Sequence, residues 1–504
     1  MTDVVSVDPR TGAAVETVAR ETTAAGTAAL CATAAEAAPG LEALGRSGRA
    51  DLLDTLADAL QAHRDEVVAV ADRETALGPA RLNGELTRTC YQLRLFGEVL
   101  REGSYLEATI DHAADTPMGP RPDLRRMLVP IGPVAVFGAS NFPLAFSVPG
   151  GDTVSALAAG SPVVVKAHES HPATSALCAL ILAGAATKAG APEGTVGIVY
   201  GRAAGVALVT DSAIRAVGFT GSLGGGQALM DAIASRPDPI PFFGELAGLN
   251  PVVVTPAAAA ERGAAIGAEL AGSFTLGGGQ FCTKPGVTLV PTGPDGDALV
   301  AAAADAVRGS AAPVLLNGGI AASYAEIAAR LSALPSVGVV ASGAEPGGDG
   351  FGGAPLLLTA PAGAVPDGLD QECFGPLGVI LRYDDRTDLL AALAGLPSSL
   401  TATVQRGTGE TELPAAVVRA LRDRAGRILF DAYPTGVAVS WAQHHGGPWP
   451  STNTQHTSVG ASAIRRFLRP VTWQNAPAEL LPAELTDDRA AIPRRVDGVL
   501  VTGA

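Results

Sequence analysis

A cysteine in a glycine-rich segment is the first residue of this sequence whose surroundings suggest chemistry. Cys282 lies in GGGQFCTKPG, residues 277–286, shortly after three glycines. Glycine lets the backbone approach a small electrophile closely, and a backbone N–H lies beside the sulfur. This context is typical of a thiol nucleophile. An ordinary buried thiol is the alternative, because free cysteine is among the most buried residue types.

Two further polar residues have surroundings that suit catalysis. Glu245 lies in FGELAGLNP, residues 243–251, between apolar and small residues. Desolvation there would raise the pKa of its carboxyl toward that of a general base, whereas a solvated or paired glutamate at a strand end is the alternative. Asn141 follows a strand-like run, at a turn before Phe142 and Pro143, where its amide can donate to an oxyanion. A turn-capping asparagine is the competing interpretation.

A candidate nucleotide site is spread over three segments. Lys166 lies near the end of the strand-like run SPVVVKA, and Glu169 follows three residues later. Open α/β sheets bind nucleotides at the carboxyl ends of their strands. In GFTGSLGGG, residues 218–226, backbone N–H groups and Ser222 can lie under a pyrophosphate. That segment is neither a G-x-G-x-x-G nor a Walker motif. Glu372, in QECFGPLG, is a candidate ligand for sugar hydroxyls.

The elements that must position these residues follow a regular pattern. Residues 22–99 are typical of Ala/Leu helices with polar faces. Short Val/Ile runs then alternate with helical segments from PVAVFGA to AIRAVGFTGS, and a second alternating stretch runs over residues 250–440. Such alternation predicts βαβ units and buried parallel sheets. The sequence therefore predicts two α/β domains that share one cleft.

Bulk properties narrow the class of protein. A chain of 504 residues is too long for one hydrophobic core, so two or more domains are expected. Its net charge of −15 argues against nucleic acid or an anionic membrane as a partner, and the Arg pairs are expected to be solvated or at subunit contacts. Five scattered cysteines, no signal peptide and no apolar run of ~20 residues predict a cytoplasmic protein.

The order of the motifs resembles one known family. The series ASNFPL, VVVKAHE, GFTGS, GELAGLNP, GGGQFC and QECFGP is similar to that of the aldehyde dehydrogenase superfamily, and the likeness covers most of the chain. It implies an α/β fold with a Rossmann-type dinucleotide-binding domain, an α/β catalytic domain and a small β extension for oligomerisation. The implied boundaries are 1–111 with 131–244, then 245–449, and 112–130 with 450–504.

The resemblance also implies roles for single residues. Cys282 would be the nucleophile, Glu245 the general base and Asn141 the side-chain oxyanion donor. The implied dinucleotide-binding residues are Lys166, Glu169, Arg202, Gly221, Ser222, Glu372 and Phe374, with Cys373 structural. In this chemistry a thiohemiacetal loses hydride to become a thioester, which water then hydrolyses to the acid.

Several segments depart from the usual family pattern and indicate a branch. ELAGLNP replaces the usual Glu-Leu-Gly-Gly-Lys segment, and Ala167 replaces a proline. KAHESHP, HGGPWP, TSVG and AIRRFLRPVTWQN resemble the 2-oxoglutarate semialdehyde dehydrogenases and NADP-linked fatty-aldehyde enzymes. The predicted reaction is oxidation of 2-oxoglutarate semialdehyde to 2-oxoglutarate. The alternatives are another aldehyde of the same branch, or a CoA-acylating reaction, against which Glu245 argues.

The branch resemblance favours NADP, whereas Glu169 favours NAD, because a carboxylate there would face the 2′-phosphate.

His168 and His171 are spaced as a metal pair, but no third ligand is evident and no metal is expected. His444, His445 and His456 are expected to serve in packing and hydrogen bonding near the substrate mouth, although a cysteine hydrolase would need a histidine partner for its thiol. A homodimer or homotetramer is expected, through an Asp115–Pro130 hairpin and the segment Arg465–Gln474.

Overall fold

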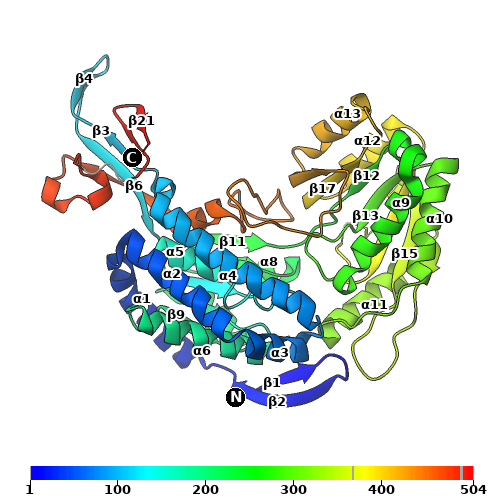
Figure 1. Cartoon of the computed structure of the whole chain (residues 1–504), viewed down its shortest axis with the longest axis horizontal. Coiled ribbons are helices and arrows are strands. Elements are labelled where there is room, and N and C mark those ends of the chain that lie inside the picture. Colours follow the sequence, from blue (N-terminus) through cyan, green and yellow to red (C-terminus); the bar gives the residue numbers. More distant parts are fainter. Residues whose placement is uncertain (1, 366–367, 370, 489–491, 503–504) are drawn as a thin grey trace.

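The computed structural model describes residues 2–365, 368–369, 371–488 and 492–502. Two α/β units form the body of the molecule, and a β arm projects from one of them (Figure 1). In that part of the chain no helix is long and apolar enough to cross a membrane.

The first α/β unit is built on a five-stranded parallel sheet in the order β11-β10-β7-β8-β9. Its strands are β7 (Val134–Phe137), β8 (Val163–Lys166), β9 (Val196–Val199), β10 (Ala216–Thr220) and β11 (Phe242–Glu245). The helices between them are α5 (Gly151–Ala159), α6 (Pro172–Lys188), α7 (Arg202–Thr210) and α8 (Leu223–Ala234). The βαβ prediction for this stretch is confirmed, because these strands pair in parallel and the apolar runs of all but the edge strand β9 are largely buried.

Four N-terminal helices cover this unit, and a hairpin precedes them (Figure 1). They are α1 (Ala24–Ala43), α2 (Gly45–Ala62), α3 (Arg64–Thr75) and α4 (Pro79–Glu102), and the hairpin is β1 (Asp3–Asp8) with β2 (Ala13–Arg20). Helix α4 buries an apolar stripe at helical spacing, which includes Leu82, Leu86, Leu93, Phe96 and Leu100. That stripe holds α4 against the core of the first unit.

The second α/β unit contains a seven-stranded sheet in the order β14-β15-β16-β13-β12-β17-β18. The strands are β12 (Val252–Val254), β13 (Val287–Pro291), β14 (Gly338–Ser342), β15 (Leu356–Pro361), β16 (Leu377–Tyr383), β17 (Ser399–Gln405) and β18 (Ala425–Phe430). All described pairs are parallel except β14 with β15. The helices are α9 (Pro256–Thr275), α10 (Pro294–Arg308), α11 (Gly318–Ser332), α12 (Arg386–Gly395) and α13 (Glu412–Leu421).

The projecting arm contains the third sheet, in the order β19-β6-β3-β20-β21 (Figure 1, upper left). Its strands are β3 (Thr109–Asp111), β6 (Leu124–Pro130), β19 (Leu468–Gln474), β20 (Arg494–Val496) and β21 (Val499–Val501). Between β3 and β6 the short hairpin of β4 (Ala114–Thr116) and β5 (Gly119–Arg121) forms the tip.

Two details of the arm correct the sequence analysis. Strand β3 pairs with β6 and β20, so residues 109–111 lie in the arm's sheet rather than in that of the first α/β unit. Residues 115–130 are not one hairpin, because β6 pairs along its whole length with β19. The strand is completed by a segment more than 300 residues away, and such long-range pairing cannot be derived from local patterns.

Candidate active site

The candidate nucleophile lies on a tight turn between the two α/β units. Cys282 follows the 3-10 turn Leu276–Gly279, in which Gly277, Gly278 and Gly279 all have positive φ, at 57°, 70° and 68°. Residues with side chains rarely adopt that conformation. A Cβ at Gly279 would also collide with the backbone carbonyl of Gly375. The three glycines thus let the chain turn back and present Cys282.

Glu245, His445 and Cys282 converge. The Nε2 atom of His445 is 2.9 Å from Oε1 of Glu245 and 3.6 Å from Sγ of Cys282. Both the histidine and the glutamate side chains are only 1% exposed. Ser458 donates its hydroxyl to Oε2 of Glu245 at 2.8 Å. Glu245 ends β11, so the carboxyl edge of the first sheet carries this carboxylate toward the thiol.

The charge state of Glu245 differs from the sequence prediction. Burial does oppose its ionisation, but the His445 charge and hydrogen bond, the Ser458 hydroxyl and the charge of Arg466 outweigh burial. Together they lower the pKa of Glu245 to about 2. The predicted rise was wrong, because the sequence does not show that three donors and cations surround the carboxyl.

The thiol is shifted in the opposite direction. Burial raises the pKa of Cys282 well above its ordinary value, and the neighbouring Glu245 carboxylate raises it further. At neutral pH the sulfur is therefore protonated in this arrangement. Formation of a thiolate requires a group that accepts the proton at the moment of attack.

His445 is the residue whose position the sequence did not reveal. Its Nδ1 is buried without a hydrogen-bond partner among the described residues, and its ring packs 6.2 Å from that of Phe146. The sequence predicted packing and hydrogen bonding for His445. The structure shows a hydrogen bond to Glu245 and contact with the thiol, a placement for which the motif HHGGPWP carries no local signal.

The buried guanidinium of Arg466 stabilises the ionised form of Glu245. Arg466 is fully buried, and its Nη1 lies 3.0 Å from Oδ1 of Asp152. Its charge is one of the influences that lower the pKa of Glu245. The expectation that Arg465–Arg466 is a solvated or subunit-contact pair is therefore wrong for Arg466, whose environment comes from the fold around α5.

The backbone near the thiol is anchored by two asparagines. Asn141 donates its side-chain amide to the carbonyl of Gln280 at 2.8 Å, two residues before the cysteine. Asn250 donates to the carbonyls of Cys282 and Lys284 at 2.8 and 3.0 Å. Asn141 thus lies against the cysteine loop, and one of its amide hydrogens is engaged there.

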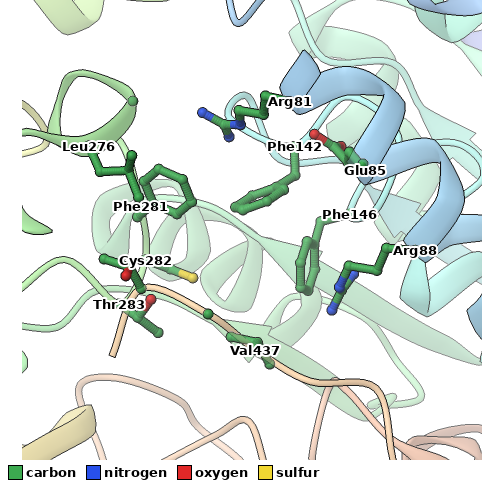
Figure 2. Close-up of a pocket in the computed structure, with 14 residues that line it drawn as sticks. Arg81, Glu85, Arg88, Phe142, Phe146, Leu276, Phe281, Cys282, Thr283 and Val437 are labelled. Atoms are coloured by element: carbon green, nitrogen blue, oxygen red, sulfur yellow. The ribbon is translucent and has the colours of Figure 1, made fainter. Parts of the chain in front are cut away.

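The thiol opens into a pocket of about 440 Å³ (Figure 2). Aromatic rings and the guanidinium groups of α4 surround it. The lining side chains include Arg81, Glu85, Arg88, Phe142, Phe146, Phe281, Cys282, Thr283 and Val437. The sequence analysis did not name the α4 residues, although Arg81, Glu85 and Arg88 recur at helical spacing within a largely buried helix.

The predicted adenosine-side residues lie together at the edge of the first sheet. Glu169 pairs with Arg202 at 3.2 Å and with Lys166 at 3.4 Å. Partial burial opposes ionisation of Glu169, but the two cations outweigh it and lower its pKa. The trio carries one net positive charge, so Glu169 does not present an uncompensated carboxylate.

The predicted pyrophosphate segment begins α8. Ser222 is the N-cap residue, and its hydroxyl accepts the N–H of Gly225 at 3.2 Å. The next N–H groups of the first turn lack intrahelical partners, as at any helix start. A Cβ at Gly224 would meet nothing within 4 Å, so this turn is open.

Glu372 and Phe374 follow β15 in a loop and are both half-buried. Burial raises the pKa of Glu372 to about 8, the charge of Lys284 opposes that rise, and Glu245 adds to it. Lys284 donates its ammonium to the carbonyls of Cys373, Gly375 and Leu377 at 2.6, 3.1 and 3.0 Å, and so fixes this loop beside the cysteine turn.

The histidine pair in KAHESHP serves the fold. His171 is fully buried, and its ring nitrogens lie 2.8 Å from the Ala139 carbonyl and 3.2 Å from the Ser175 hydroxyl. Its ring stacks on that of His168. Within the described chain, the group of metal-type ligands that converges is instead Glu245, Cys282 and His445, whose atoms lie within 4.8 Å of one another. The absence of a metal stays a prediction.

Comparisons with known proteins identify the family and the fold. The aldehyde dehydrogenase family matches residues 2–314. Alpha-ketoglutaric semialdehyde dehydrogenase 2 of Azospirillum brasilense is 46% identical over 93% of this chain and 90% of its own length. Alpha-ketoglutaric semialdehyde dehydrogenase of Acinetobacter baylyi is 44% identical, over 90% and 87%. Aldehyde dehydrogenase C of Pseudomonas syringae, solved with NAD+ and octanal, has a TM-score of 0.79 at 21% identity over 95% of each chain, which shows the shared fold.

The chain belongs to the aldehyde dehydrogenase family. It is an oxidoreductase that acts on an aldehyde.

Proposed function

We propose that this enzyme oxidises 2-oxoglutarate semialdehyde to 2-oxoglutarate. The observation that carries the proposal is the convergence of Cys282, His445 and Glu245 at the base of a pocket that also holds two guanidinium groups. The relatives at 46% and 44% identity, both named as alpha-ketoglutaric semialdehyde dehydrogenases, support this substrate.

The first half of the reaction forms a bond between sulfur and carbon. Cys282 attacks the aldehyde carbon while its proton passes to the His445–Glu245 pair, which is the acceptor that a thiol of raised pKa requires. The resulting alkoxide of the thiohemiacetal is stabilised by the Asn141 amide and a backbone N–H. One such donor is typically worth ~10²–10³ in rate.

The second half breaks that bond. Loss of hydride from the thiohemiacetal carbon leaves a thioester on Cys282. Glu245, whose ionised form is held by His445 and Ser458, takes a proton from water, and the hydroxide attacks the thioester. The carboxylic acid leaves as the C–S bond breaks. Of the two protons that the His445–Glu245 pair has taken up, from the thiol and from water, one returns to the sulfur and the other passes to solvent.

The dinucleotide accepts the hydride when it is bound, and residues of the first α/β unit, together with Glu372 and Phe374 of the second, fit it. Lys166 and Arg202 would hold the adenosine side, Ser222 and the open start of α8 beside Gly221 the pyrophosphate, and Glu372 with Phe374 the nicotinamide side. The open space at Gly224 and the free N–H groups of the α8 start support this fit.

We infer that both NADP and NAD serve as cofactor and that NADP is used measurably. Glu169 would repel a 2′-phosphate if it were alone, but Lys166 and Arg202 neutralise it and leave one positive charge. Those cations can form charge-assisted hydrogen bonds with a phosphate. In the sequence the branch resemblance favoured NADP and Glu169 favoured NAD, and the ion pairs of Glu169 support NADP.

The domain boundaries stay a proposal: a dinucleotide-binding domain around the first sheet, a catalytic domain around the second, and the β arm for assembly into a homodimer or homotetramer. The arm's edge strands β19 and β21 lack a partner on their outer sides among the described strands, and Val499 and Leu500 are 65% and 60% exposed. Five free cysteines, one of them the proposed nucleophile, support a reducing cytoplasm.

The test measures NAD(P)H absorbance with 2-oxoglutarate semialdehyde, succinic semialdehyde, pentanal and decanal, with both cofactors and with or without CoA. We expect the highest kcat/KM for 2-oxoglutarate semialdehyde and no dependence on CoA. Preference for decanal would instead support a fatty-aldehyde enzyme, and a requirement for CoA would support acyl transfer.

A further inference from the structure

The pocket above Cys282 contains cationic groups that the reaction steps do not use. Helix α4 places Arg81, Glu85 and Arg88 on one face, because these residues are spaced by four and three positions. All three line the pocket (Figure 2). Their charges therefore affect which substrates bind in the pocket.

Arg88 is the group without a partner. Both Nη1 and Nη2 are buried, and neither donates a hydrogen bond to an acceptor among the described residues. The guanidinium lies over the Phe146 ring, 4.9 Å from its centroid, and Figure 2 shows it beside that ring. A buried donor that is left unsatisfied is unfavourable, so a guanidinium of this kind in the lining of a pocket is available to an anionic ligand.

The other charged residues of the pocket do not neutralise Arg88. Glu85 uses Oε1 to accept the N–H groups of Leu144 and Ala145 at 2.8 and 2.9 Å. Its Oε2 is buried without a hydrogen-bond partner among the described residues, so it forms no hydrogen bond with Arg88. Burial lowers the pKa of Arg88, while Glu85, Cys282 and Glu245 act to raise it. Arginine remains charged in proteins under such conditions.

Arg81 has a different role, because it is already engaged. Its Nη2 donates to the carbonyl of Asn141 at 2.7 Å, and its guanidinium lies 5.0 and 4.6 Å from the ring centroids of Phe142 and Phe281. Arg81 therefore braces the Asn141 turn against the cysteine loop. One nitrogen, Nη1, remains without a partner and adds positive potential.

We propose that Arg88 binds the carboxylate of the substrate and so selects aldehydes that carry a 2-oxo acid at the far end of a short chain. This inference rests on the proposed function and names the residue that recognises its substrate. The planar fork of Nη1 and Nη2 matches a carboxylate in a bidentate manner. Phe142, Phe146 and Phe281 form apolar walls for the methylene groups between the carboxylate and the aldehyde.

The test compares the wild type, Arg88→Met and Arg88→Lys with a control on the solvent side of α4. Arg94→Met is that control, because Arg94 pairs with Asp58 at the surface and its side chain is 44% exposed. The measured quantity is kcat/KM for 2-oxoglutarate semialdehyde relative to pentanal, which has the same number of carbons and no carboxylate.

We expect Arg88→Met to lower that ratio on the order of 10²-fold, mainly through KM, with pentanal oxidation retained. Arg88→Lys should recover part of the loss, and Arg94→Met should match the wild type. Calorimetric binding of the product 2-oxoglutarate gives a readout without turnover and should weaken in Arg88→Met while the Kd for NADP is unchanged, which also shows that the variant is folded.

Two outcomes overturn the inference in distinguishable ways. If the wild type prefers 2-oxoglutarate semialdehyde and Arg88→Met keeps both that preference and product binding, Arg88 does not bind the carboxylate, while the proposed function stands. If the wild type has the same kcat/KM for pentanal as for 2-oxoglutarate semialdehyde, the proposed function fails, and with it the reason to expect a group that binds the substrate carboxylate.

Discussion

Glu245 and His445 are 200 residues apart in the chain, yet Oε1 of the first lies 2.9 Å from Nε2 of the second, and both side chains are excluded from solvent. The same Nε2 is within 3.6 Å of the Cys282 sulfur. The histidine therefore links the proposed nucleophile to the proposed base. This linkage, and the low pKa that it gives Glu245, lead to the following predictions.

His445→Gln keeps a donor toward Glu245 but removes a group that can take up a proton. We expect kcat/KM to fall by about 10²–10⁴, with a smaller deficit at high pH, where hydroxide deprotonates the thiol directly. The measurement is steady-state kinetics over a pH series. Turnover close to that of the wild type at neutral pH would show that His445 only fills space.

Glu245→Gln separates the two halves of the reaction. The first hydride transfer should survive, while hydrolysis of the thioester should slow by about 10²–10⁴. Stopped-flow absorbance should then show a burst of NAD(P)H that matches the enzyme concentration, followed by a slow steady state. Loss of the burst itself would show that His445 cannot take up the thiol proton without the Glu245 carboxylate.

The raised pKa of Cys282 predicts the pH dependence of its alkylation by iodoacetamide. Only the thiolate reacts, so below the raised pKa the inactivation rate should increase about tenfold per pH unit. Glu245→Gln removes a charge that raises this pKa, so alkylation at a given pH should be faster than in the wild type. A rate that levels off below pH ~8 in the wild type would contradict the raised pKa. Cys282→Ser, which is expected to lack turnover, is the control: the peptide that is alkylated in the wild type but not in this variant is the one that contains residue 282.

Cofactor choice should respond to the ion pairs of Glu169. Glu169→Thr frees Lys166 and Arg202, so the KM for NADP should fall far more than that for NAD. Arg202→Ala should act in the opposite direction and raise the KM for NADP. The ratio of kcat/KM for the two cofactors is the measurement. An unchanged ratio in both variants would remove this cluster from the 2′ position.

The β arm predicts assembly. Strands β19 and β21 present open edges, and Val499 and Leu500 are exposed on β21. Sedimentation velocity should show a dimer or tetramer at micromolar concentration. Replacing both Val499 and Leu500 with Lys should shift the distribution toward smaller species, whereas a fully active wild-type monomer would disprove the assembly role.

Local sequence was sufficient where the signal is itself local. The Val/Ile runs that became β7 to β10 predicted a parallel sheet because strands buried on both faces contain few polar residues. The glycines at 277–279 indicated a turn that presents Cys282, and all three adopt positive φ. The order of the short motifs was enough to predict the family to which the chain belongs.

The sequence by itself thus determined the α/β architecture, the family and the segments from which the site is built. Only the tertiary structure decided the chemical state of that site. Burial alone would have raised the pKa of Glu245, and it is His445, Ser458 and Arg466, brought in from the C-terminal region, that lower it. Likewise the fold encloses Arg88 without an acceptor within the described chain. Hydrogen bonds and charges act over a few ångströms in space, so neighbours that the chain supplies from hundreds of residues away leave no mark in a local pattern.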